Sequence, residues 1–320
     1  MAITAGAPGF DVSGSGVGSF DPASARKRER IPLRQQLAGY LFVSPWIIFF
    51  FGIFAYPLGF AVWMSFYDYF FAAPGANVDR PFVGFDNYWD ALTDEKVRES
   101  FKNIVVFLVI NVPLTVILAI ALATALNAAI PFRAFFRTAF YLPYVTASVA
   151  TIGVWLWLFS GNGLVNKLLG PLAPDPTWLI NERLAMPSIA IYVTWKQLGF
   201  YILLYLAALQ NVQKELYEAA SVDGAGKWDA FRNVTWPGVR PATTLVVVLA
   251  IITGSNLFTE PYLLTGGGGP NGASSSPVLI MYQRGIQQGD AGAAAAIGVI
   301  LVLFVGTVGL IARRVSEGSS

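Results

Sequence analysis

The chain contains no histidine and no cysteine, and only 12% of its 320 residues are charged. These absences exclude disulfides, thiolate chemistry, imidazole acid–base catalysis and the usual zinc, haem and copper sites, and leave only a metal site built from carboxylates. A soluble domain carries roughly 25% charged residues, so this chain has too few charges to cover a soluble surface. With 55% hydrophobic residues, the composition predicts a membrane protein.

Six long apolar segments account for most of the hydrophobic residues. A helix that crosses a hydrocarbon core about 30 Å thick needs about 20 residues, and each segment is near or above that length. Helix is the open-ended element that satisfies its own backbone in lipid. The sequence therefore predicts an all-α integral membrane protein with six transmembrane helices, at 39–66, 104–125, 139–159, 188–209, 244–264 and 291–312.

The rest of the chain divides around these spans. Residues 1–34 are rich in Gly, Ser and Ala and hold too little apolar material to fold alone, which predicts a disordered tail rather than a cleavable signal peptide. The transmembrane domain is expected over 35–314, with a polar loop at 211–241 between spans four and five, and a short C-terminal tail follows at 315–320.

The distribution of Lys and Arg predicts the orientation in the membrane. Basic residues are more numerous in the tail, in the second and fourth connections and after the last span than in the other loops. The positive-inside rule then places both termini and the polar loop in the cytoplasm. The residues that decide this most strongly directly flank spans: Arg30, Arg34, Arg313 and Arg314.

The polar loop reads as a helix, a glycine turn and a second helix. Residues 214–223 have high helix propensity, and Gly224 stands where a left-handed turn is expected. A second helix is predicted at 227–233, with Pro237 and Pro241 ending it before the fifth span. Local chemistry alone leaves two interpretations open: a solvated hairpin, or a docking surface for another protein.

A family resemblance favours the docking surface. The order Glu218-Ala219-Ala220, then Asp223-Gly224-Ala225, then Phe231, Val234, Pro237 and Pro241 resembles the signature of permease subunits of binding-protein-dependent ABC importers. The stretches "SPWIIFFFGIFAYPLGFAVWMSFYDY", "FVGFDNYWDAL", "FYLPYVTASVA", "WKQLGFYILLYLAALQNV" and "NLFTEPYLLTGGGGP" are similar to the carbohydrate-uptake branch, specifically the first membrane subunit of maltose and glycerol-phosphate type transporters. Gln213 and Trp236 depart from the pattern, which often has Pro and Leu there.

The resemblance implies roles for five residues of the loop, which would form a coupling helix in a cleft of the ATP-hydrolysing subunit. Glu218 would be the coupling residue, Ala219 and Ala220 close-packing positions, and Gly224 a backbone requirement of the turn. Asp223 would either pair with a basic residue of the ATPase or cap its own loop.

The same resemblance implies the partners. The chain would be no enzyme and would hold no cofactor, because ATP and Mg would bind to a separate ATPase subunit. A second homologous permease subunit, two ATPase subunits and an extracytoplasmic solute-binding protein would complete an alternating-access importer in the bacterial plasma (inner) membrane, with no nucleic acid involved. The alternative from another class is a self-contained channel or secondary transporter for a small solute. An intramembrane enzyme is disfavoured by the lack of His and Cys.

Candidate residues for the substrate path come from the polar and aromatic side chains of the spans, because sugars present hydroxyls and an apolar C–H face. The candidates are Asn256, Phe258, Glu260, Tyr262 and Lys196. An ionisable residue in a span is a functional hypothesis by default. Hydration of Glu260 at the outer interface and snorkelling of Lys196 to the headgroups are the alternatives. The run Gly266–Gly269 lacks the Gly-Lys-Ser/Thr of a phosphate-binding loop and reads as an outer loop near the path.

Overall fold

The computed structural model describes residues 33–72, 78–128 and 131–317, so the predicted disordered tail lies outside it except for Leu33 and Arg34. The described residues form helices and isolated bridges, with no β-strand among them. They divide into two units, Met1–Pro57 and Leu58–Ser320. The all-helical prediction is confirmed.

The first unit contains helix α1 (Leu33–Phe49) and the π-helical segment η1 (Phe50–Ala55), and α2 (Tyr56–Met64) begins at its end. None of the described side chains of α1 or η1 is buried. The run 39–64 is apolar and long enough to cross a membrane. An exposed apolar helix of this length is typical of a span that lies against lipid or another span.

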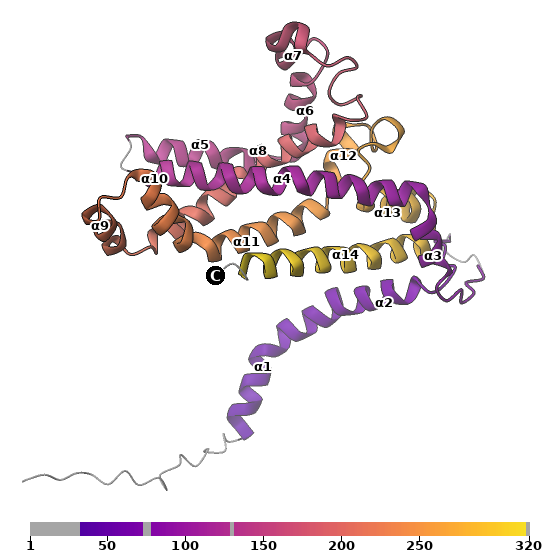
Figure 1. Cartoon of the computed structure of the whole chain (residues 1–320). Helices are drawn as coiled ribbons and strands as arrows, with labels where there is room; N and C mark the ends of the chain where they lie inside the picture. Colours follow the sequence, from indigo (N-terminus) through magenta and orange to yellow (C-terminus); the bar gives the residue numbers. More distant parts are fainter. Residues whose placement is uncertain (1–32, 73–77, 129–130, 318–320) are drawn as a thin grey trace, which may run out of the picture. The chain divides into compact units, whose positions relative to one another are not determined.

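The second unit holds the remaining helices (Figure 1). Their bounds are α3 Asp86–Thr93, α4 Glu95–Asn127, α5 Arg133–Val145, α6 Ser148–Leu158, α7 Leu164–Leu169, η2 Gly170–Leu172, α8 Ala185–Gln210, α9 Lys214–Val222, α10 Lys227–Ala230, η3 Phe231–Thr235, α11 Trp236–Ser255, α12 Thr259–Leu264, η4 Pro270–Gly272, α13 Pro277–Tyr282, η5 Gln283–Gln287 and α14 Ala291–Glu317.

Helices α4 and α8 pack along each other at the centre of this unit; α5 packs on α8, α11 packs on both, and α14 packs on α11. Ile104 and Ile189 are fully buried in their contact. Asn111 donates a 2.7 Å hydrogen bond to the hydroxyl of Thr194, so the buried amide is partnered. At Gly199 a Cβ would lie 2.2 Å from the carbonyl oxygen of Phe140, so only glycine permits this close approach of α5 and α8.

Five described helices are long and apolar enough to cross a membrane, and a bent pair brings the number to six if it counts as one span. The pair is α5 and α6, which meet at 97° with a break at Thr146 and Ala147. Figure 1 shows α6 projecting away from the layer of α4, α5 and α8. The predicted third span, 139–159, is therefore not a straight helix.

The fifth predicted span also differs. Pro237 and Pro241 do not end a helix, because α10, η3 and α11 follow one another without interruption from Lys227 to Ser255. Pro237 lies inside this run, directly after the π-helical segment η3, where the regular α-helical hydrogen-bond pattern is already altered. The chain then breaks at residues 256–258, so Asn256 and Glu260 do not lie in one continuous helix.

Candidate functional site

Helix α9 ends in a complete Schellman motif. The N–H of Ala225 donates to the carbonyl of Ala220 at 2.9 Å, and the N–H of Gly224 donates to that of Ser221 at 3.1 Å. Gly224 has φ +78°, and a Cβ there would meet no atom within 4 Å. The glycine is therefore required by backbone conformation rather than by space, as the sequence predicts.

The second part of the loop is tied back to the first. The phenol of Tyr217 in α9 shares a 3.0 Å hydrogen bond with the hydroxyl of Thr235, which is buried in η3. Asp229 accepts a 3.3 Å hydrogen bond from the N–H of Gly226 and so caps α10. Because α10, η3 and α11 are one helical run, the loop is joined directly to the fifth span.

Four of the five predicted coupling residues are exposed: Glu218, Ala219, Asp223 and Gly224, with Ala220 half-buried. The carboxylates of Glu218 and Asp223 make no hydrogen bond or ion pair within the described part of the chain. Two large apolar side chains lie exposed beside them, Val222 at 88% and Trp228 at 70%. Trp228 stacks on Phe231 at 5.6 Å, as their spacing predicts. The exposure of Val222 and Trp228 was not predicted, although Val222 is an apolar residue at a helix end, two residues before Gly224, where exposure is common.

The path candidates that follow α11 form an aromatic cluster with a residue that sequence reasoning missed. Phe258 stacks on Tyr262 with ring centroids 5.4 Å apart, and Tyr282 of α13 lies edge-on to both, at 5.1 and 5.8 Å. Asn256 ends α11, and its amide donates to the carbonyl of Ile252 at 2.7 Å. No local signal in the sequence joins Tyr282 to this group.

Lys196 in α8 and Glu260 in α12 lie on two helices that pack together, and the two side chains form no direct ion pair. The ammonium of Lys196 hydrogen-bonds the hydroxyl of Ser148, the first residue after the break between α5 and α6. Nearby, Tyr192 and Thr151 share a 2.8 Å hydrogen bond. The structure thus gathers two separately predicted residues into one polar cluster of α6, α8 and α12.

A second polar group in the spans was not predicted as a site. The phenol of Tyr201 lies 3.3 Å from the hydroxyl of Thr253 and 3.4 Å from the amide oxygen of Gln197. Thr253 is exposed, one turn before the end of α11. This group links α8 to α11 with groups that can bind a hydroxylated solute. The polar run after residue 252 was the signal that could have found Thr253.

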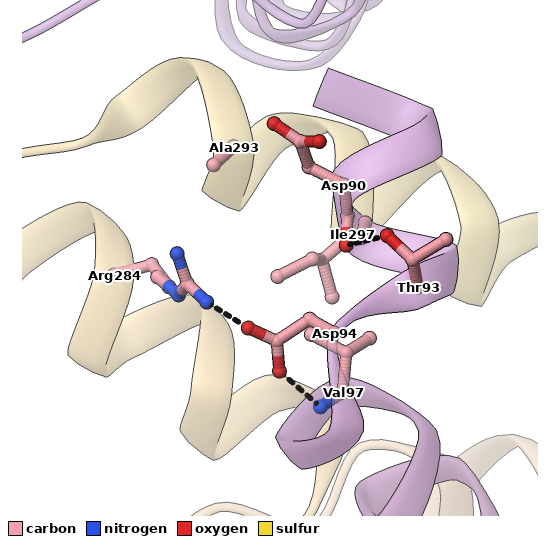
Figure 2. A pocket seen from close by; sticks show the side chains of 8 residues that line it. Asp90, Thr93, Asp94, Val97, Arg284, Ala293 and Ile297 are labelled. Atoms are coloured by element: carbon pink, nitrogen blue, oxygen red, sulfur yellow. Dashed lines mark hydrogen bonds and ion pairs between the residues drawn. The ribbon is translucent and has the colours of Figure 1, made fainter. Parts of the chain in front are cut away.

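The end of the second unit that lies away from α9 and α10 is held by a long-range ion pair. Figure 2 shows Asp94, at the start of α4, paired with Arg284 of η5. The other carboxylate oxygen of Asp94 accepts a 3.1 Å hydrogen bond from the N–H of Val97 and caps the helix. A hollow of about 350 Å³ lies beside the pair, with Asp90 and Thr93 on its wall.

Against this geometry, residues 115–318 match the family model described as binding-protein-dependent transport system inner membrane component. The match runs from the second half of α4 to α14 and covers more than half of the chain. The chain belongs to this family of inner membrane components. The matched region includes Glu218, Gly224 and the aromatic cluster.

Several curated relatives of this inner membrane component are named as permease proteins of saccharide transport or uptake systems. The chain is 33% identical over 290 residues to the arabinooligosaccharides transport system permease protein AraP of Bacillus subtilis, covering 88% of this chain and 89% of that one. It is 30% identical over 249 residues to the lactose transport system permease protein LacF of Rhizobium radiobacter, covering 76% and 81%. It is 27% identical over 280 residues to the diacetylchitobiose uptake system permease protein NgcF of Streptomyces coelicolor, covering 82% and 78%.

A solved structure shares the fold of this inner membrane component. A chain of a bacterial ABC transporter involved in the import of the acidic polysaccharide alginate superposes with a TM-score of 0.74 at 23% identity. The superposition covers 89% of this chain and 96% of that chain. The likeness extends beyond the residues of the family match and supports the helical architecture of nearly the whole chain.

Proposed function

We propose that this chain is the transmembrane permease subunit of an ATP-driven importer for a sugar or sugar-like solute. The family description supplies the dependence on a binding protein and the inner membrane. The names of the relatives supply the substrate class, since arabinooligosaccharides, lactose and diacetylchitobiose are all saccharides. Both termini lie in the cytoplasm in this proposal, as the Lys and Arg distribution predicts.

The observation that carries the proposal is the exposed surface of α9 and its cap. Glu218 and Asp223 have no partner in the described part of the chain, and Val222 and Trp228 expose apolar side chains beside them. Apolar side chains rimmed by polar ones are typical of a protein-binding surface. The sequence has no Gly-Lys-Ser/Thr motif, so ATP and Mg bind to a partner ATPase, and this surface is the part that contacts it.

The helical run from Lys227 to Ser255 supports the mechanism. When two ATPase subunits close on ATP, the movement of the coupling loop is carried through this run, because α10, η3 and α11 are continuous. Thr253 and Asn256 at its far end then move against α8 and α12. A second homologous permease subunit supplies the other half of the path, and a binding protein delivers the solute. Rocking between inward- and outward-facing states completes an alternating-access cycle.

The substrate path in this proposal passes the residues that end α11 and begin α12. Phe258 and Tyr262 offer aromatic faces to the C–H surface of a sugar, and Asn256 offers an amide to its hydroxyls. Lys196 hydrogen-bonds Ser148 of α6, and Glu260 lies on α12, which packs against α6 and α8. Replacing Lys196 with Met is expected to change the rate of transport and to leave the binding of the ATPase subunit unchanged.

A self-contained channel or secondary transporter is the alternative, and energy coupling separates the two. We expect uptake by cells that hold the complete transporter to require ATP and to persist when ion gradients are collapsed. Glu218→Lys is expected to reduce uptake to background, because the reversed charge faces the ATPase, whereas Asp86→Lys, an equal charge change on exposed α3, leaves uptake unchanged. Gradient-driven uptake that Glu218→Lys does not alter would favour the alternative.

A further inference from the structure

A second hollow lies at the end of the unit away from α9, beside the start of α4. It has a volume of about 490 Å³, which is within the range of small-molecule sites. Six of its lining residues have polar side chains: Glu95, Lys96, Glu99, Asn271, Ser275 and Gln283. None of the sequence predictions placed a site here.

The wall of this hollow is fixed by hydrogen bonds that reach distant parts of the chain. The amide of Asn103 in α4 donates to the carbonyls of Gly272 at 2.8 Å and Ser275 at 3.1 Å. The N–H groups of Gly267 and Gly268 both donate to the carbonyl of Pro261, at 3.2 and 3.1 Å. A wall held in this way loses little freedom when a ligand binds, which favours affinity.

Several hydrogen-bonding groups that face the hollow are unused. The carboxylate of Glu95 and the ammonium of Lys96 make no hydrogen bond or ion pair within the described part of the chain. Asn271 uses its NH₂ group on Glu182 at 2.6 Å, and Gln283 uses its own on the carbonyl of Gly267 at 3.4 Å. Their amide oxygens therefore remain available as acceptors.

The charges of the hollow are nearly balanced. Glu99 is paired with Lys102, with 3.1 Å between the ammonium and a carboxylate oxygen, and the free carboxylate of Glu95 stands beside the free ammonium of Lys96 in the chain. Hydroxyl groups both donate and accept, so they can satisfy the carboxylate, the amide oxygens and the ammonium together. The lining holds two carboxylates, Glu95 and Glu99, against one ammonium, Lys96, so the carboxylate of a uronic acid would meet more like charge than opposite charge.

We propose that this hollow is a subsite for one end of a neutral saccharide, at the outer mouth of the path. The inference rests on the proposed function and assigns the substrate class within it: neutral rather than acidic sugars. The carbonyl of Pro261, which holds the wall, lies in α12 between Glu260 and Tyr262, so the wall is hydrogen-bonded to the helix that carries two path candidates.

The absence of cysteine makes the subsite directly testable, because one introduced thiol is the only one in this chain. We would introduce Gln283→Cys in the complete transporter in lipid nanodiscs and measure its rate of modification by N-ethylmaleimide. The matched control is Gln287→Cys, the same substitution on the same short helix at an exposed residue outside the hollow. The probes are lactose, diacetylchitobiose, arabinotriose and an alginate trisaccharide.

A neutral saccharide at about twice its dissociation constant fills about two thirds of the sites and should slow the labelling of Gln283→Cys about threefold. The control should not slow, and the alginate trisaccharide should protect neither. Protection by the alginate trisaccharide alone would overturn the neutral assignment. Protection by the loaded binding protein but not by free sugar would show a protein contact in place of a saccharide site.

Uptake by the wild-type transporter separates this proposal from the function beneath it. If the transporter imports one of the neutral sugars with ATP but that sugar does not slow the labelling, the subsite is wrong and the function stands. If the transporter imports no saccharide at all, the proposed function fails and the subsite fails with it. At saturating loaded binding protein, Gln283→Ala should lower the transport rate several-fold, and Gln287→Ala should not.

Discussion

The two ends of the Leu58–Ser320 unit are built in opposite ways. At one end, the polar loop 211–241 presents Glu218, Asp223, Val222 and Trp228 to the surface with few contacts of their own. At the other, residues far apart in sequence are tied together by Asp94–Arg284 and by the amide of Asn103. The first arrangement leaves groups available for a partner, and the second forms hollows before any ligand arrives.

This contrast gives each end a different mutational signature. At the end held by Asp94–Arg284 and Asn103, called the braced end below, substitutions should change the stability of this chain by itself, because the lost contacts are internal. At the end with the polar loop 211–241, substitutions should mainly change the binding of partner subunits, because most of the exposed groups have no internal contact to lose. Four measurements test the contrast, beginning with the largest expected effect.

Asp94→Asn should destabilise the braced end most, since it removes a charged partner of Arg284 and weakens the cap on α4. We expect a loss of about 1.5–3 kcal/mol in the free energy of unfolding in detergent. The matched control is Glu99→Gln, which breaks the exposed Glu99–Lys102 pair and should cost about 0–1 kcal/mol. Equal losses in the two variants would show that Asp94–Arg284 does not brace this end.

A double-mutant cycle isolates the Asp94 pair. The loss in Asp94→Asn combined with Arg284→Gln should be smaller than the sum of the two single losses, because the pair can be broken only once. Additive losses would mean that each residue acts through other contacts.

Gly224→Ala should have an intermediate effect, because alanine is strained at φ +78° even though the space is open. Forcing a left-handed conformation on it costs roughly 1–2 kcal/mol, which corresponds to roughly a fivefold to thirtyfold loss in binding of the ATPase subunit. The control is Gly226→Ala at φ −71°, a conformation open to any residue. Equal binding by both variants would show that the left-handed conformation at Gly224 is not needed for binding of the ATPase subunit.

Tyr217→Phe should have the smallest effect, since it deletes only the hydrogen bond between α9 and Thr235. We expect about 0.5–1.5 kcal/mol of local stability to be lost, seen as faster amide hydrogen exchange in residues 214–222. The exchange of α3 at the other end should stay unchanged. Faster exchange at both ends would mean that the two ends are not independent.

Local patterns predict much of this fold, and the failures share a physical cause. Helix propensity and a glycine turn are properties of a few neighbouring residues, so α9 and Gly224 could be read from the sequence. The chain bends by 97° at Thr146 and Ala147, and Pro237 lies inside a continuous helical run directly after the π-helical segment η3. Neither is visible in hydrophobic periodicity.

The candidate sites show the same limit. The predicted path residues were chosen by type, and two of them have partners far away in the chain: Phe258 lies beside Tyr282, and Lys196 beside Ser148. The hollow at the start of α4 is lined by segments that lie far apart in the sequence, and local patterns cannot show that such segments meet. Composition identifies groups that suit a sugar, and only the fold shows which of them face one another.

The proposed function depends on one contact, in which the surface around Glu218 binds a separate ATPase subunit. The most direct test is to purify the tagged chain in mild detergent as wild type, Glu218→Lys and Asp86→Lys, and to identify the co-purifying proteins by mass spectrometry. We predict that the wild type and Asp86→Lys bring down a P-loop ATPase and a second polytopic membrane protein, and that Glu218→Lys retains the membrane partner but loses the ATPase. A wild-type chain that purifies alone and still moves solute without ATP would contradict the account.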